Sequence, residues 1–257
     1  MLRRHSFGLA TALAAALLLL GRAAVRAEDD HGFVNRVHKD AEGKEYKYVV
    51  FVPHDHKADD TSDKRWPVIL FLHGAGERGD DGELQAKVGL APAIRKREKE
   101  FPFIAVFPQC VKNSWWRAEV PDGERAMAIL AEVEKEYKTD RDRVYLTGLS
   151  MGGMGTWSLA MKYPDRFAAL VPICGRGDNS QAAKIAKLPI WCFHGDADKA
   201  VAVDGSRSMI AAIKEAGGNP KYTEYPGVGH NSWDAAYGTD ELYTWLLQQK
   251  RNTKVKE

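Results

Sequence analysis

A serine in a glycine-rich turn is the residue of this chain best suited to nucleophilic chemistry. Ser150 stands in the pattern G-x-S-x-G at residues 148–152, between the apolar segment 144–147 and the helical pattern 151–163. A strand that turns sharply into a helix projects the serine hydroxyl, and the helix N-terminus behind it favours developing negative charge. This context predicts a nucleophile for acyl transfer rather than a solvent-facing serine in a structural turn.

A serine nucleophile needs a base and an acid that orients the base, in the chain order serine, acid, histidine for this kind of turn. His230 lies in a glycine-rich loop after the predicted strand 221–225, so it is the candidate base. His194 precedes the acid, and we expect it to be packed and hydrogen-bonded. Asp196 and Asp198 both follow a predicted strand, and the residues themselves leave both open as the acid.

The oxyanion that forms during acyl transfer needs backbone donors. One expected donor is the N–H of Met151, directly after the nucleophile. The second should follow an earlier strand, and the segment 70–76 predicts the N–H of Ala75. His73 in this segment is expected to shape the turn rather than to act chemically.

Further side chains are candidates for contacts with the substrate. Trp115 and Trp116 follow a predicted strand, and Trp233 lies shortly after the candidate base. Aromatic side chains there could form a platform for a sugar ring or an aryl acyl group, the alternative being packing at the rim of the domain. Glu77 and Arg78 extend the oxyanion loop and could bind a polar substrate group or form a solvated pair.

The motifs around these residues, taken together, resemble the secreted α/β-hydrolase esterases. The segments that carry the resemblance are 70–79, 148–153, 194–198 and 225–230. The group that they resemble is the predicted phospholipase/carboxylesterase and prolyl-oligopeptidase-like proteins, akin to feruloyl and acetyl-xylan esterases. The resemblance extends over roughly residues 45–248. It implies that Asp198 is the acid and that esters are hydrolysed without a cofactor. No metal is expected, because the sequence contains no C-x-x-C pair or Cys/His cluster.

The elements that must position these residues alternate between strands and helices. Strand-length apolar segments are 46–52, 67–72, 103–107, 144–147, 168–173, 189–193 and 221–225, and helical patterns are 123–137, 151–163, 205–216 and 239–249. Nearly continuous apolar strands are typical of parallel sheets that helices cover on both faces. We therefore expect an α/β-hydrolase fold with a doubly wound, mostly parallel sheet. The segment after Ile173 is short, which predicts a minimal lid or none.

The N-terminus has the pattern of a secretory signal peptide over residues 1–27, the alternative being an uncleaved membrane anchor. This leader holds four arginines and no acidic residue, so its removal changes the formal net charge from +2 to −2. We expect residues 28–257 to form a single catalytic domain that is periplasmic or extracellular and binds no nucleic acid. Cys174 and Cys192 lie at or near predicted strands, where buried thiols are the simpler interpretation.

The expected function is therefore hydrolysis of carboxylic esters by a secreted serine esterase through an acyl-enzyme intermediate. The substrate would be a small molecule or an ester carried on a polysaccharide, such as a feruloyl or acetyl ester. Two alternatives remain open at this stage. One is a serine peptidase of the prolyl-oligopeptidase-like type, and the other is a non-catalytic carbohydrate-binding protein on a hydrolase scaffold.

Overall fold

A single mixed sheet organises the protein in a computed structural model that describes residues 31–57 and 61–251. The eight strands lie in the order β1-β2-β4-β3-β5-β6-β7-β8. Their bounds are β1 Gly32–Lys39, β2 Glu45–Val52, β3 Trp66–Leu72, β4 Ile104–Pro108, β5 Thr139–Leu149, β6 Ala169–Ile173, β7 Trp191–Gly195 and β8 Lys221–Tyr225. Strand β2 runs antiparallel to both of its neighbours, and the pairs from β4 to β8 are parallel.

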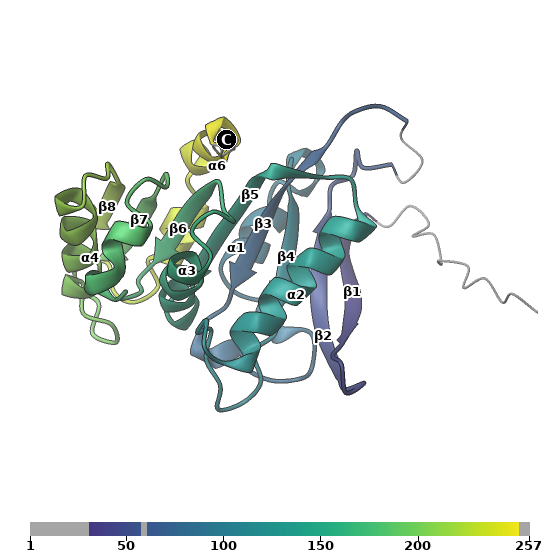
Figure 1. The fold of residues 1–257 in the computed structure, drawn as a ribbon, viewed down its shortest axis with the longest axis horizontal. Coiled ribbons are helices and arrows are strands. Elements are labelled where there is room, and N and C mark those ends of the chain that lie inside the picture. The colour runs from purple at the N-terminus through teal and green to yellow at the C-terminus, as the bar shows by residue number, and fades with distance from the viewer. Residues whose placement is uncertain (1–30, 58–60, 252–257) are drawn as a thin grey trace, which may run out of the picture.

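Helices cover both faces of this sheet (Figure 1). Their bounds are α1 Leu90–Arg95, α2 Pro121–Glu136, α3 Met151–Lys162, α4 Asp204–Glu215, α5 Trp233–Tyr237 and α6 Asp240–Gln248. Helices α2, α3 and α4 pack on one face, and α1 and α6 pack on the other. The predicted doubly wound α/β-hydrolase fold is confirmed.

The central strands are apolar along their whole length because both of their faces are buried. In β3, Leu70 and Leu72 face one apolar cluster, whereas Ile69 and Phe71 face the other. This alternation follows from the two-residue period of a strand. Burying one such side chain contributes about 2 kcal/mol, so the two clusters hold the carboxyl ends of the strands in fixed positions.

Three elements were not predicted as they stand, the strand β1 and the short helices α1 and α5. The polar N-terminal segment contains an edge strand, β1, which pairs with β2 over its whole length through a hairpin. The short helix α1 follows Gly89, whose φ of 71° is in the left-handed region. A Cβ on Gly89 would lie 2.5 Å from a methyl group of Leu149, so only glycine fits this close approach.

The connection between β6 and β7 is short and contains one 3₁₀ helix, Asn179–Lys184. A minimal lid was expected at this place. Within residues 31–57 and 61–251, none of the helices combines the length and the apolar character needed to cross a bilayer. Residues 1–27, where the signal peptide is predicted, lie outside the described residues.

Candidate active site

The nucleophile candidate, Ser150, occupies a strained turn between β5 and α3. Its φ is 53°, an uncommon value for a residue with a side chain. A Cβ on Gly152 would lie 1.8 Å from the carbonyl oxygen of Leu72, and one on Gly148 would lie 2.7 Å from the same oxygen. The two glycines of the motif are therefore required because the turn presses directly against the end of β3.

Two further contacts hold the serine backbone in this turn. The N–H of Ser150 donates to the carbonyl oxygen of Ile173 at 3.0 Å and lies 3.3 Å from the thiol sulfur of Cys174. Cys174 itself has a φ of 39°. Burial raises the pKa of its thiol to about 12, so the sulfur is neutral and acts as a packing group and weak acceptor.

The structure brings Ser150, His230 and Asp198 together in a chain of hydrogen bonds. His230 Nε2 lies 2.9 Å from Ser150 Oγ, and His230 Nδ1 lies 2.7 Å from Asp198 Oδ2. These side chains follow strands β5, β8 and β7, whose carboxyl ends meet at the same edge of the sheet. In this arrangement Nδ1 donates its proton to the carboxylate, which leaves Nε2 free to accept the serine proton.

The side chain of Asp198 is buried, and both of its carboxylate oxygens have donors. Oδ1 accepts the N–H groups of Ala200 and Val201 at 2.8 and 2.9 Å. Burial raises the pKa of Asp198, but the hydrogen bond from His230 and the two backbone donors outweigh burial, and the pKa lies below its ordinary value. The carboxylate is thus ionised at neutral pH and can orient an imidazole.

A second histidine supports the same carboxylate. His194 is fully buried, and its Nε2 lies 3.2 Å from Asp198 Oδ2 and 3.0 Å from the carbonyl oxygen of Val201. Because a carbonyl can only accept, Nε2 carries the proton, and Nδ1 accepts from Ser206 Oγ at 2.7 Å. The packing expected for His194 is present, but its contact with Asp198 was not predicted.

Asp196, the other candidate acid, points elsewhere. Its Oδ1 accepts the N–H of Gly227 at 2.6 Å, which ties the loop after β7 to the loop that carries His230. The structure therefore separates the two aspartates: Asp198 contacts the imidazole, and Asp196 caps a turn.

The two expected oxyanion donors belong to segments that lie next to Ser150. Met151 is the first residue of α3, so its N–H has no acceptor within the helix. Ala75 begins a 3₁₀ helix, Ala75–Glu77, directly after β3. A Cβ built on Gly74, the residue before Ala75, would lie 3.8 Å from Ser150 Cβ, so this turn borders the nucleophile.

His73 fixes the turn that carries Ala75. Its Nδ1 lies 2.6 Å from the carbonyl oxygen of Gly74, and its Nε2 accepts the N–H of Cys110 at 2.9 Å. Burial lowers the pKa of His73 to about 4, so the ring is neutral. A neutral ring with one donor and one acceptor matches these two partners, so His73 stabilises the turn that carries Ala75.

The adjacent tryptophans have different environments. Trp116 is buried and donates its indole N–H to the carbonyl oxygen of His73 at 3.0 Å, so the prediction of Trp116 as a substrate platform is wrong. The cause is that consecutive side chains point in different directions, and the turn needs a donor here. Trp115 is 41% exposed, with the guanidinium groups of Arg78 and Arg117 4.9 and 5.6 Å from the centre of its ring.

The remaining substrate-contact candidates lie close to Ser150, His230 or the loop after β3. Arg78 is half-buried, with its Nη2 3.0 Å from the sulfur of Met151. Burial raises the pKa of Glu77, whose carboxylate accepts the backbone N–H of Gly74. Trp233 packs edge-on against His230, with ring centres 5.3 Å apart. Arg78 therefore contacts the residue that follows Ser150, whereas Glu77 contacts the oxyanion loop and Trp233 contacts the imidazole of His230.

One group of side chains has ligand types suited to a metal. The potential ligand atoms of Cys174, Asp198 and His230 all lie within 4.8 Å of one another. His230 already bonds Asp198 and Ser150, however, and Cys174 lies against the Ser150 backbone. The hydrogen bonds of these atoms thus correspond to those of a serine nucleophile and its neighbours.

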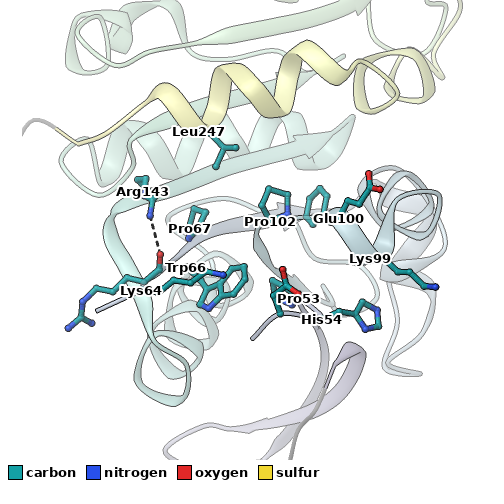
Figure 2. A pocket seen from close by; sticks show the side chains of 13 residues that line it. Pro53, His54, Lys64, Trp66, Pro67, Lys99, Glu100, Pro102, Arg143 and Leu247 are labelled. Atoms are coloured by element: carbon teal, nitrogen blue, oxygen red, sulfur yellow. Dashed lines mark hydrogen bonds between the residues drawn. The ribbon is translucent and has the colours of Figure 1, made fainter. Parts of the chain in front are cut away.

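A separate pocket lies at the opposite edge of the sheet, where the parallel strands begin (Figure 2). Pro67 at the start of β3, Pro102 before β4 and Leu247 of α6 line it. Figure 2 also shows Arg143 donating to the carbonyl oxygen of Arg65, a bond of 3.0 Å. This pocket is remote from the edge that carries Ser150, so it plays no part in the site.

Comparisons with known proteins find similarity to ester hydrolases. A solved structure titled as a thermostable esterase superposes with a TM-score of 0.78 at 37% identity, covering 85% of this chain and 63% of that one. The "probable carboxylesterase SOBER1-like" of Arabidopsis thaliana is 25% identical over 210 residues, covering 72% of this chain and 79% of the relative. An endo-1,4-beta-xylanase/feruloyl esterase of Xylanibacter ruminicola is 26% identical and covers 80% of this chain and 30% of the relative.

The fold and these relatives define the class of the protein as a carboxylic ester hydrolase with an α/β-hydrolase fold. The chain belongs to the dienelactone hydrolase family, which it matches over residues 80–236. The predicted resemblance to α/β-hydrolase esterases is confirmed. The chain spans less than two thirds of the length of the thermostable esterase, 63%.

Proposed function

We propose that the protein hydrolyses carboxylic esters by a two-step acyl transfer with Ser150 as the nucleophile, His230 as the base and Asp198 as the orienting acid. The observation that carries this proposal is the pair of hydrogen bonds of 2.9 and 2.7 Å that joins the three side chains. Their chain order and their position after strands support the same assignment.

In the first step, His230 Nε2 takes the proton of Ser150 as its oxygen attacks the ester carbonyl carbon. The backbone N–H groups of Met151 and Ala75 stabilise the negative charge that develops on the carbonyl oxygen. His230 then returns the proton to the leaving alcohol, and the acyl group stays on Ser150. In the second step, water attacks the acyl group by the same route and releases the acid.

The substrate class that we propose is an ester carried on a plant polysaccharide, with a feruloyl or acetyl group as the acyl part. The feruloyl esterase in the name of the Xylanibacter relative supports this class. The site also offers the exposed ring of Trp115 beside Arg78, where a sugar or aryl ring could stack. The predicted leader, residues 1–27, would direct export of the enzyme out of the cytoplasm, to where such polymers occur.

The test is hydrolysis of a substrate panel by the mature protein beside the Ser150→Ala variant. The panel holds p-nitrophenyl acetate, methyl ferulate, acetylated xylan and a proline-containing peptide anilide. Ester turnover that falls on the order of a millionfold in the variant supports the mechanism. Equal ester turnover by pure Ser150→Ala protein would refute the nucleophile, and turnover of the anilide alone would favour a peptidase.

A fluorophosphonate probe gives a second readout that does not depend on finding the right ester. The probe should label the wild-type protein and leave Ser150→Ala unlabelled, because only an activated serine reacts with it. A wild-type protein that takes up no label would point to a non-catalytic binding role.

A further inference from the structure

A groove beside the oxyanion loop has no part in the proposed chemistry. It has a volume of about 520 Å³, and Val37, Tyr46, Lys47, Asp80, Gln109 and Lys112 are among the residues that line it. We call it the hairpin groove because residues of the β1–β2 hairpin form one wall, at one end of the sheet in Figure 1. We infer that this groove binds the glycan chain that carries the ester, and that it favours chains with acidic sugars. This inference rests on the proposed esterase function.

The hairpin groove opens at the same edge of the sheet as the candidate active site. Strand β2 is antiparallel to β4, and its residue Tyr48 pairs with Pro108, the last residue of β4. The beginning of β2 therefore lies beside the carboxyl ends of the parallel strands. The other wall comes from the loops that follow β3 and β4, which include Gly79 and Lys112.

One buried side chain joins the hairpin groove to the oxyanion loop. Gln109 is 4% exposed, and its Nε2 donates to the carbonyl oxygen of Glu77 at 3.1 Å. Its Oε1 accepts the N–H of Gly82 at 2.8 Å. Arg78, which precedes the groove residue Gly79, reaches the sulfur of Met151. A chain lying in the groove thus continues along one wall to the residue after the nucleophile.

The lining of the hairpin groove suits a sugar chain better than an apolar ligand. Its volume lies within the range of about 300–1,000 Å³ that is typical of ligand pockets. Its lining combines ammonium, carboxylate and amide groups with three apolar surfaces, the exposed Val37, the ring of Tyr46 and Val111. The guanidinium of Arg125, 3.8 Å from the centre of the Tyr46 ring, holds that ring in place. Sugars present the same mixture of hydroxyl groups and apolar C–H faces.

The charges of the hairpin groove favour an acidic chain. Three lysines line it, Lys44, Lys47 and Lys112, against the carboxylates of Glu45 and Asp80. Outside the lining, Glu45 pairs with Lys39 at 2.8 Å and Lys44 interacts with the carboxylate of Asp40, so the groove keeps an excess of one positive charge whether or not these neighbours are counted. A uronate carboxylate on the glycan would find ammonium groups within reach, whereas a neutral chain would find only hydrogen bonds.

The experiment compares a groove variant with a matched control on two substrates. The groove variant is Lys47→Ser/Lys112→Ser, and the control is Lys64→Ser/Lys99→Ser, which removes two lysines from the pocket of Figure 2 at the opposite edge. The readout is the ratio of kcat/KM for acetylated glucuronoxylan to kcat/KM for p-nitrophenyl acetate. The groove variant should lower this ratio about tenfold, as expected for two partly exposed ionic contacts. The control should keep the wild-type ratio.

An unchanged ratio in the groove variant, or an equal fall in the control, would overturn the inference. A wild-type protein that cleaves p-nitrophenyl acetate but not the polymer would overturn it as well, while leaving the esterase function intact. Binding is measured separately by calorimetry with Ser150→Ala protein and deacetylated glucuronoxylan fragments, which requires no catalysis. These fragments should bind more tightly than neutral xylan fragments. Equal or absent binding would refute the preference of the groove for an acidic glycan, even if no ester were hydrolysed.

Discussion

The replacement of Asp198 by asparagine is the sharpest test of Asp198 as the orienting acid, because the structure dictates the orientation of the new side-chain amide. Oδ1 of Asp198 accepts two backbone N–H groups, from Ala200 and Val201. An asparagine side chain has one acceptor oxygen, which must take this position. Its NH₂ group then replaces Oδ2 and faces His230 Nδ1, at 2.7 Å in the wild-type protein.

The consequence is a change of tautomer at His230. A donor opposite Nδ1 requires that Nδ1 accept, so the ring proton moves to Nε2, the atom that faces Ser150. An Nε2 that carries a proton cannot take another from the serine. We expect kcat to fall about 10⁴-fold, the loss typical of a triad with the wrong tautomer. His194 Nε2 would face the same amide, and this clash of donors should cost about 1–3 kcal/mol of stability.

The assay is the steady-state rate on p-nitrophenyl acetate, with circular dichroism and thermal unfolding to show that the variant is folded. Asp196→Asn is the matched control, because Oδ1 of Asp196 accepts the N–H of Gly227, which an amide oxygen also does. The control should keep kcat within a factor of about three. A loss below tenfold in Asp198→Asn, or the same loss in both variants, would refute the assignment of Asp198.

Three more predictions concern stability and substrate range. Gly152→Ala should destabilise the fold by more than about 3 kcal/mol, because its Cβ would lie 1.8 Å from the Leu72 carbonyl oxygen. Gly76→Ala, where a Cβ meets nothing within 4 Å, should leave the Tm within a few degrees of wild type, and equal Tm losses would contradict the packing argument. Burial lowers the pKa of His73 from 6.5 to about 4. Between pH 6.5 and pH 4 the imidazole is therefore protonated in the unfolded chain but neutral in the native protein. Stability should therefore fall by up to about 3 kcal/mol as the pH drops from 6.5 to 4, and His73→Gln should flatten that part of the Tm profile. With only a 3₁₀ helix between β6 and β7, hydrolysis of p-nitrophenyl palmitate should show no jump above its critical micelle concentration, and a sharp jump would indicate a lid that moves.

Much of the fold could be predicted because its signals are local. The buried strands are apolar runs, and the largest helices have a 3.6-residue pattern, so their positions agreed with the structure to within a few residues. The exceptions have physical reasons. Strand β1 is at the edge of the sheet and carries polar side chains, and the helices α1 and α5 are too short to show a periodic pattern.

The candidate site could be predicted in part. The serine turn and the glycine-rich loop around His230 are short motifs whose residue types follow from the chemistry they must do. The choice between Asp196 and Asp198 could not be made from residue type, because both follow β7 and both are carboxylates. Only the direction of each side chain decides which one meets the imidazole, and that direction depends on backbone N–H groups in the loop.

The contact of His194 with Asp198 also had no local signal. Its other partners, Ser206 of α4 and Val201 of the loop after β7, are not predicted by any spacing pattern in the sequence. The same holds for Cys174 beside Ser150, since these two residues belong to the ends of different strands.

The amino-acid sequence by itself determined the class of chemistry and the order of the main elements, and it singled out Ser150 and His230 as the candidate nucleophile and base, because each of these depends on residue types at close spacing. Tertiary structure alone decided which aspartate serves the histidine, which of two adjacent tryptophans is exposed, and that a groove joins the β1–β2 hairpin to the oxyanion loop. Those features arise where segments far apart in the chain are packed together by the two apolar clusters of the sheet. Packing on that scale depends on the whole fold, so no short stretch of residues encodes it.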